Sequence, residues 1–263
     1  MNLRGGKALV SRLWMSYMSS RGFFWVLAFG HLMPPLMYMF VWTTAAGQGV
    51  VGGYNRDEFV VYYLVLMVLH EFTYPVSNYT VGDVIRYGGF STWLLRPLHP
   101  IYEAVGTDIA TKAVNMPFTF GLALVLGLAL RPVVMIAPLN WLLFVPALVL
   151  AYTLRFLMAY VLALLAFWSQ RADALLSLND TLLFLFAGQV APIALLPGAL
   201  QTAAVLLPFR YMLSFPVELL LGRMTPQQTL AGFAGQAGWL LVAFLLHQLV
   251  WKHGLRHYSA VGG

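Results

Sequence analysis

The sequence predicts an all-α integral membrane protein with about six transmembrane helices, an N-terminal interfacial helix and a broken re-entrant segment before the last span. Three observations support this fold class. Hydrophobic residues make up 60% of the 263-residue chain and charged residues only 9%, whereas soluble domains average about 25% charged. Apolar runs of about 20 residues, the length that crosses a bilayer as a helix, recur along the chain. The basic residues behind the net charge of +6 are spread over the connecting segments, which argues against a nucleic-acid partner.

The first 22 residues carry basic side chains between apolar ones at helical spacing, which predicts an amphipathic helix lying in the membrane interface. A cleavable signal peptide is disfavoured because the polar region extends to Gly22 and the apolar run after it is long enough to span. The chain contains no cysteine, which excludes disulfides and thiolate metal sites.

The predicted spans are residues 23–43, 59–79, 105–130, 139–168, 175–196 and 230–251. Pro34 and Pro35 are expected to kink the first span, and Arg131 with Pro132 to end the third. Residues 197–228 are apolar enough to enter the membrane, yet four prolines cut them into pieces too short to cross it. Such a segment is typical of a re-entrant or interfacial pair of helices packed against protein.

An even number of spans places both termini on one side of the membrane. Ten basic residues fall on that side and four on the other, so the positive-inside rule predicts cytoplasmic termini. The predicted inner set is Arg4, Lys7, Arg12, Arg21, Arg86, Arg96, Lys112, Arg171, Lys252 and Arg256. No soluble domain is expected, and residues 1–263 are interpreted as one transmembrane domain.

Residues 83–100 are the longest polar and basic interruption on the predicted cytoplasmic side. Asp83 opens a helical turn, where the helix dipole favours an acid, and Gly88 with Gly89 breaks that turn. An apolar and aromatic run follows, and Arg96 before Pro97 ends it. The pattern fits two interpretations, a solvated loop or a surface helix that docks a separate cytoplasmic protein.

Arg155 falls near the middle of a span, where a charge costs about 2.5–3.5 kcal/mol. Glu71, in another span, is the natural counter-charge. We expect the two residues to pair inside the helix bundle or to line a polar cavity there, either to fix helix register or to contact substrate.

Signatures of catalysis are weak. His70 and Glu71 lack the second histidine of a zinc-protease motif, and His253 with His257 stands in a cationic cluster at a membrane edge. No Gly-rich phosphate loop occurs, so this chain is not expected to bind ATP by that means. We predict no catalytic residue and no metal site.

Three groups of residues resemble type-2 ATP-binding-cassette permeases, six-span subunits of the kind encoded with a separate ATPase and a second similar permease. The first group is residues 85–89 followed by 94–98, which looks like the family's cytoplasmic loop. The second is residues 166–168, which close the fourth span. The third runs from Ala191 and Pro192 through residues 207–211, 215–216 and 221–222 to the tail residues Trp251, Gly254, Tyr258 and Ser259.

The resemblance implies a permease, more readily an exporter than an importer, that alternates its access when a pair of ATPase subunits closes on ATP. ATP and Mg²⁺ would be bound by the ATPase, and no cofactor is expected on this chain. A second permease subunit, the same chain or a related one, and membrane lipid complete the expected partners. The location implied is the cytoplasmic membrane, with several passes and both termini in the cytoplasm.

The resemblance also implies site residues. The N-terminal helix and residues 83–100 would contact the ATPase, with the coupling residues Asp83, Ile85, Arg86, Gly88, Gly89, Leu94, Arg96 and Pro97. The segment before the last span would cap the outer end of the pathway, with Pro208, Phe209, Arg210, Tyr211, Pro216 and Glu218. A charge at Arg210 departs from the family pattern, which favours either an anionic or zwitterionic substrate or a salt bridge to Glu218.

Two other function classes fit the composition. A proton-coupled secondary transporter would use Glu71, His70 and Arg155 as its core, but the chain shows no matched pair of repeats. A membrane-embedded lipid-modifying enzyme lacks clustered acids, histidines or metal-ligand spacing.

Overall fold

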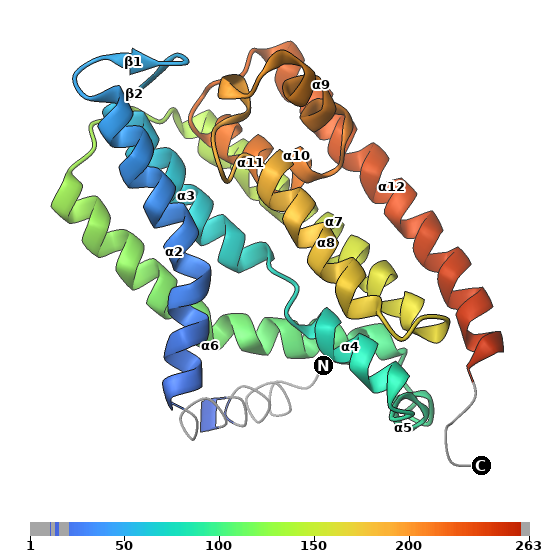
Figure 1. Cartoon of the computed structure of the whole chain (residues 1–263). Helices are drawn as coiled ribbons and strands as arrows, with labels where there is room; N and C mark the ends of the chain where they lie inside the picture. Colours follow the sequence, from blue (N-terminus) through green and yellow to red (C-terminus); the bar gives the residue numbers. More distant parts are fainter. Residues whose placement is uncertain (1–10, 12–13, 16–20, 259–263) are drawn as a thin grey trace.

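The computed structural model describes residues 11, 14–15 and 21–258. The predicted interfacial helix at residues 1–22 therefore lies almost wholly outside the described residues. Long helices extend between an upper end, which carries a small hairpin and short helices, and a lower end, where the last helix stops (Figure 1). The elements are α2 Arg21–Ala46, β1 Val50–Val51, β2 Tyr54–Asn55, α3 Arg56–Thr73, α4 Ser77–Arg86, α5 Phe90–Leu94, α6 Pro100–Leu130, α7 Pro138–Leu164, α8 Ala172–Phe186, α9 Gly198–Leu206, α10 Phe209–Met212, α11 Ser214–Leu220 and α12 Pro226–His257, with short 3₁₀ turns at Leu165–Phe167 and Ile193–Leu195. This architecture confirms the all-α prediction.

Among the residues that the structure describes, four stretches are long and apolar enough to cross a membrane, judged by length and composition: Arg56–Arg86, Pro100–Leu130, Pro138–Phe167 and Pro226–His257. They coincide with the second, third, fourth and sixth predicted spans. Helix α2 covers the first predicted span with 26 residues and holds Pro34 and Pro35 inside it. The count of six spans stays a prediction.

Two predicted spans are interrupted. Helix α3 ends at Thr73, because Pro75 forces Tyr74 into an extended conformation, and α4 starts only at Ser77. The predicted second span at 59–79 therefore contains a helix break. Helix α8 has only 15 residues and ends at Phe186, so the α-helix stops ten residues before the predicted end of the fifth span at residue 196. Gly188 adopts a left-handed φ of 78° just beyond it, a conformation that glycine accepts without strain.

Other helix boundaries follow the sequence closely. Helix α6 ends at Leu130, where Arg131 takes a left-handed φ of 46° and Pro132 prevents continuation. Helix α12 starts with a capping box between Thr225 and Gln228 and with Pro226 in its first turn. The segment before α12 consists of the separate short helices α9, α10 and α11, which confirms that it is broken.

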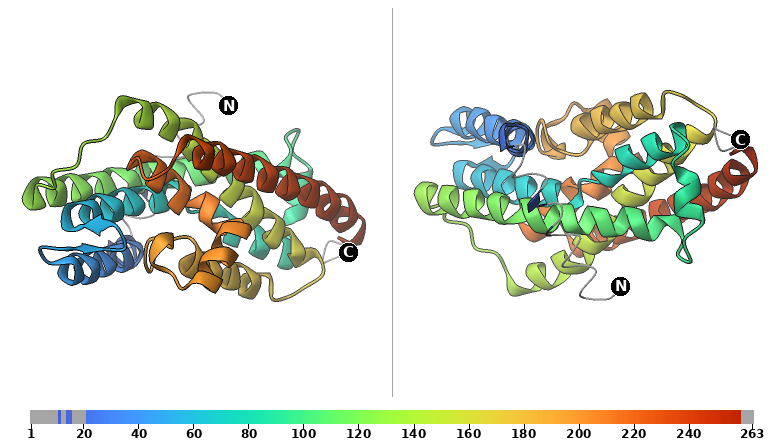
Figure 2. Two further views of the ribbon diagram at one scale, coloured as in Figure 1. Left: turned by 90° about the horizontal axis from the view of Figure 1, so that it is seen from above. Right: turned by 90° about the horizontal axis from the view of Figure 1, so that it is seen from below.

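Helix α7 is the central element, since it packs against α3, α4, α8, α11 and α12. Helix α3 lies between α2 and α6 (Figure 2). The upper part of the core is built around α3 and includes Phe59, Tyr62 and Met67. The lower part joins α4, α5 and the end of α7 through Val81, Phe90 and Phe167. The two parts of the core meet near the break between α3 and α4.

Candidate functional site

Residues 83–100 form the end of α4, a tight turn, the short helix α5 and the entry to α6, all at the lower end of the molecule (Figure 1). The turn depends on Gly88, which has a left-handed φ of 78°. The predicted glycine break is therefore present, and Gly88 is the residue that needs the freedom of glycine.

Helix α5 is fixed to the rest of the bundle by Phe90. Its ring is fully buried and meets Phe167, Trp251 and Tyr258 edge-on at centroid distances of 5.5, 6.0 and 5.7 Å. The hydroxyl of Tyr258 donates to the Gly88 carbonyl at 2.9 Å and accepts from the backbone N–H of Ser91 at 3.1 Å. The ends of α7 and α12 thus hold α5 in a defined position.

Both arginines of this stretch have partners within the chain. Arg86 forms an ion pair with Asp83, a second with Asp173 at 3.6 Å, and a 2.9 Å hydrogen bond to the carbonyl of Gln170. Arg96 pairs with Glu103 at 2.7 Å. Arg86 therefore joins α4 to the start of α8, a contact that the sequence did not indicate.

The surface of this stretch is largely apolar. Tyr87, Leu94, Leu95 and Leu98 are 75%, 40%, 87% and 66% exposed, and we call these four residues the lower ridge. Ile85, predicted as a coupling residue, is buried at 4% exposure and belongs to the core. Pro97 is exposed beside the ridge. The structure thus presents exposed apolar side chains on an element that is packed against the ends of α7 and α12.

A layer of buried polar side chains surrounds the break between α3 and α4. The guanidinium of Arg155 on α7, 1% exposed, donates to the hydroxyl of Thr73 at 2.8 Å and to the carbonyl of His70 at 3.2 Å. These bonds go to the last turn of α3. Glu71 is buried close by and acts on Arg155 electrostatically, together with Asp108 and Asp180. The two residues share this layer, and Arg155 also bonds Thr73 and His70.

A second buried charge pair lies in the same layer and was missed from the sequence. The ammonium of Lys112 contacts Asp108 one turn earlier on α6 at 2.6 Å and donates to the Tyr74 carbonyl at 2.7 Å. The hydroxyl of Tyr152 donates to the same Asp108 oxygen at 3.0 Å. Lys112, placed in the predicted inner set of basic residues, is buried in the helix bundle, and its position on the inner side stays a prediction. The i, i+4 spacing of Asp108 and Lys112 is the signal that would have found the pair.

The polar layer compensates for the interrupted helix. A break inside a span frees backbone carbonyls that lipid cannot satisfy. Lys112 donates to the carbonyl of Tyr74 at the break. Arg155 donates to the carbonyl of His70, which also accepts the last helical hydrogen bond of α3 from the Tyr74 N–H. The amide of Asn78 on α4 donates to the carbonyl of Phe156 on α7 at 3.0 Å. These bonds fix the direction in which α4 and α5 leave α3.

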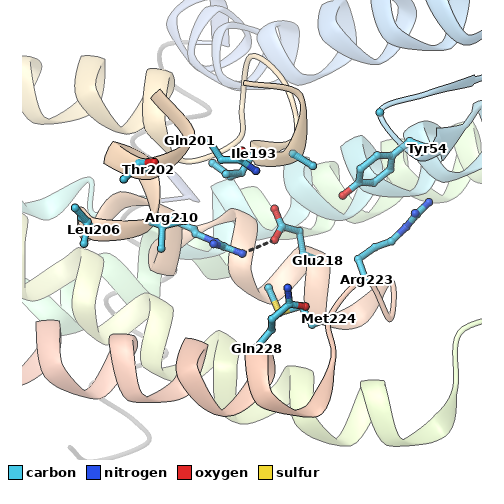
Figure 3. Close-up of a pocket in the computed structure, with 13 residues that line it drawn as sticks. Tyr54, Ile193, Gln201, Thr202, Leu206, Arg210, Glu218, Arg223, Met224 and Gln228 are labelled. Carbon is cyan, nitrogen blue, oxygen red and sulfur yellow. Dashed lines mark hydrogen bonds and ion pairs between the residues drawn. The ribbon is translucent and has the colours of Figure 1, made fainter. Parts of the chain in front are cut away.

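The upper end holds a polar cavity of about 540 Å³. Its wall is built from the β1–β2 hairpin, the short helices α9 to α11 and the start of α12, and includes Tyr54, Gln201, Thr202, Arg210, Glu218 and Gln228. Figure 3 shows Glu218 between Arg210 on one side and Tyr54 with Arg223 on the other. The predicted salt bridge from Arg210 to Glu218 is present, at 2.9 Å. Burial raises the pKa of the Glu218 carboxyl, and Arg210 acts in the opposite direction.

The other predicted cap residues support this wall. Phe209 is buried, Pro208 caps α10, and Pro216 lies inside α11. The hydroxyl of Tyr211 donates to the carbonyl of Val205 on α9 at 2.8 Å. Arg223 closes the opposite side, since it forms an ion pair with Glu58, donates to the Gly53 carbonyl at 2.7 Å and stacks over the Tyr54 ring at 4.3 Å.

Comparison with known proteins identifies one relationship. The family model described as "ABC-2 family transporter protein" matches residues 32–262. A search of curated proteins gave no match. The matched range includes all four candidate spans, the lower ridge, the polar layer and the upper cavity.

Proposed function

The chain belongs to the ABC-2 transporter family, and from this premise we propose that it is the permease subunit of an exporter driven by a separate ATPase that docks on residues 83–100. ATP and Mg²⁺ are bound by that ATPase. The permease works as a pair, with a copy of itself or a related chain, in the cytoplasmic membrane. Both termini and the lower ridge face the cytoplasm, and the pathway alternates its opening as ATP is hydrolysed.

The observation that carries this proposal is the lower ridge. Four exposed apolar and aromatic side chains occur on a short helix and its flanks, and exposed apolar surface of this kind marks interaction sites. Phe90 and Tyr258 hold the ridge rigidly against the ends of α7 and α12. A rigid support is needed if movement of the docked ATPase is to be passed to the spanning helices.

The arginines contribute in a different way from that expected. Because Arg86 and Arg96 are already paired within the chain, we assign the docking contacts to the ridge and assign Arg86, which joins α4 to the start of α8, to its support. Export as the direction follows from family analogy. A proton-coupled transporter built on Glu71, His70 and Arg155 is less favoured, since Arg155 is bonded to the helix break it stabilises.

Affinity purification of the tagged full chain from its native membrane, with mass spectrometry of the retained proteins, tests the docking site. We expect an ATP-binding-cassette ATPase with the wild type and its loss in Leu95→Glu combined with Leu98→Glu. Thr92→Glu is a control for added charge, because it places one negative charge, half that of the double variant, at an exposed position of α5 and removes no apolar side chain. Retention of the ATPase by the double variant would overturn the assignment of the ridge, and the absence of any ATPase from the wild type would overturn the proposed function.

The direction of transport requires its own experiment. In inside-out membrane vesicles, added ATP reaches the ATPase directly, and an exporter accumulates substrate inside the vesicle. ATP-dependent loss of preloaded substrate from such vesicles would show an importer.

A further inference from the structure

The upper cavity contains a charge pair whose hydrogen bonding is incomplete. Arg210 and Glu218 contact each other through one nitrogen and one oxygen, at 2.9 Å. Among the described residues, the second carboxylate oxygen of Glu218, Oε1, and the Nε of Arg210 are buried and make no hydrogen bond of ordinary geometry, although the backbone N–H of Ile193 is near enough to the carboxylate to lower its pKa. Native proteins leave few buried polar atoms unsatisfied, and such atoms call for an explanation.

The position of these atoms points to a ligand. Both side chains line the cavity of about 540 Å³, and the Glu218 carboxylate extends toward its middle (Figure 3). The Glu218 side chain is 9% exposed and that of Arg210 20% exposed. The last torsion of glutamate is broad, so the carboxylate can turn to meet a ligand without movement of the rest of the side chain.

The charges around the cavity are balanced. Arg210 is matched by Glu218, and Arg223 by Glu58. A ligand with a single net charge would bring an uncompensated charge into a partly buried site, which is costly. A ligand carrying one positive and one negative group adds none. It can donate N–H bonds to Glu218 Oε1 and accept one from Arg210 Nε.

Neutral polar groups complete the lining. Gln201, Thr202 and Gln228 stand on α9 and on the first turn of α12, and amide and hydroxyl groups bind the polar linker or the anionic oxygens of a small molecule equally well. The cavity therefore combines a few convergent polar groups in a preformed concavity, as small-molecule sites do.

We propose that the upper cavity binds a small zwitterion, a primary ammonium joined by a short linker to a phosphate or carboxylate, with the ammonium on Glu218 and the anion on Arg210. The ligand is either a free small molecule or the head group of an amino-phospholipid, which share this chemistry. This proposal concerns binding by this chain alone, so it does not depend on whether an ATPase docks at the lower ridge.

The test measures binding of phosphoethanolamine to the full chain in nanodiscs made only of phosphatidylglycerol, by isothermal titration calorimetry without ATP or ATPase. We expect saturable binding that is at least about tenfold tighter than that of ethanolamine or inorganic phosphate. Phosphocholine should also bind at least about tenfold more weakly, because its trimethylammonium has no N–H to donate. Equal binding of phosphate alone or of phosphocholine would overturn the proposal, as would no binding of phosphoethanolamine up to about 10 mM.

Two variants test whether phosphoethanolamine binds in the upper cavity. Glu218→Gln keeps the shape of the side chain and should weaken phosphoethanolamine at least about tenfold. Since Glu218 is buried and this variant can impair folding, Thr202→Phe is the second variant, because it fills the cavity from an exposed position. It should also weaken binding, while Thr92→Phe at the opposite end should not. Unchanged affinity in both cavity variants would overturn the assignment.

A final experiment decides whether the ligand is a lipid head group or a free zwitterion. Nanodiscs that contain phosphatidylethanolamine should lower the apparent affinity for phosphoethanolamine if the lipid head group occupies the cavity. An unchanged affinity in these nanodiscs assigns the site to a free zwitterion.

Discussion

The hydroxyl of Tyr258 bonds the carbonyl of Gly88 at a distance of 2.9 Å, across 170 positions of sequence. Tyr258 follows the last turn of α12, and Gly88 forms the turn between α4 and α5. The same hydroxyl accepts a hydrogen bond from the backbone N–H of Ser91. One side chain thus connects the final spanning helix to the stretch on which we propose that the ATPase docks.

Tyr258→Phe should destabilise the protein by about 1–2 kcal/mol, because two hydrogen bonds are lost and the Ser91 N–H loses this acceptor. The ring contacts with Phe90 and Phe167 stay, so the loss reports the hydroxyl alone. Equilibrium unfolding of the purified protein in detergent measures it. Tyr102→Phe is the control, since that side chain is 61% exposed. Equal stability of Tyr258→Phe and wild type would show that the bond contributes nothing.

The buried pair of Asp108 and Lys112 gives the second prediction. Lys112→Met should cost about 3–5 kcal/mol, because it leaves a fully buried carboxylate without its cation. Adding Asp108→Asn removes that charge and should recover most of the stability, so the double variant should be more stable than Lys112→Met.

Unfolding curves of the wild type, the two single variants and the double variant at one pH measure these differences in stability. Additive effects of the two substitutions would contradict an energetic coupling between the residues.

Much of the helical architecture could be predicted, because local backbone chemistry decides it. Arg131 before Pro132 ends α6, and prolines divide the segment before α12. The break at Pro75 was missed because the apolar run continues through it. Hydropathy indicates how long an apolar segment is, but not whether the helix within it is continuous. The early end of α8 was missed for the same reason, since residues 187–196 are apolar and yet form a turn.

The candidate sites were predictable in position but not in their contacts. Residues 83–100 do form a surface element, yet Arg86 faces Asp173 on α8, and Arg96 faces Glu103. Such ion pairs join segments that are far apart in sequence or lie on different elements, and they cannot be predicted from a single sequence. The Arg210 to Glu218 pair was predictable because its members are eight positions apart in one short segment.

Two glycines of α12 should respond in opposite ways to alanine. A methyl group at Gly232 would overlap the ring of Phe215 on α11, whereas nothing lies within 4 Å of one at Gly238. Gly232→Ala should therefore destabilise by about 1–3 kcal/mol through overpacking. Gly238→Ala should be neutral or stabilising by up to about 1 kcal/mol, because alanine favours the helix. Thermal unfolding of both variants in one detergent makes the comparison. An equal change in stability in the two variants would show that α11 moves away from the added methyl group without a loss of stability.

Arg86 offers a test that separates support of the ridge from direct contact with the ATPase. Arg86→Gln removes the cation, while Asp83→Asn combined with Asp173→Asn keeps the cation and removes its partners. If Arg86 supports α4 and α5, both changes loosen the same junction with α8, and both should lower retention of the ATPase in affinity purification. If Arg86 instead binds an acidic group on the ATPase, the double asparagine variant should retain the ATPase fully, because the freed guanidinium is then more available.

Arg96→Gln is the matched control, since it removes an equal charge from the pair with Glu103 and leaves the junction with α8 untouched. We expect Arg86→Gln and the double asparagine variant to behave alike. Loss of the ATPase in Arg86→Gln alone would place Arg86 in the interface itself.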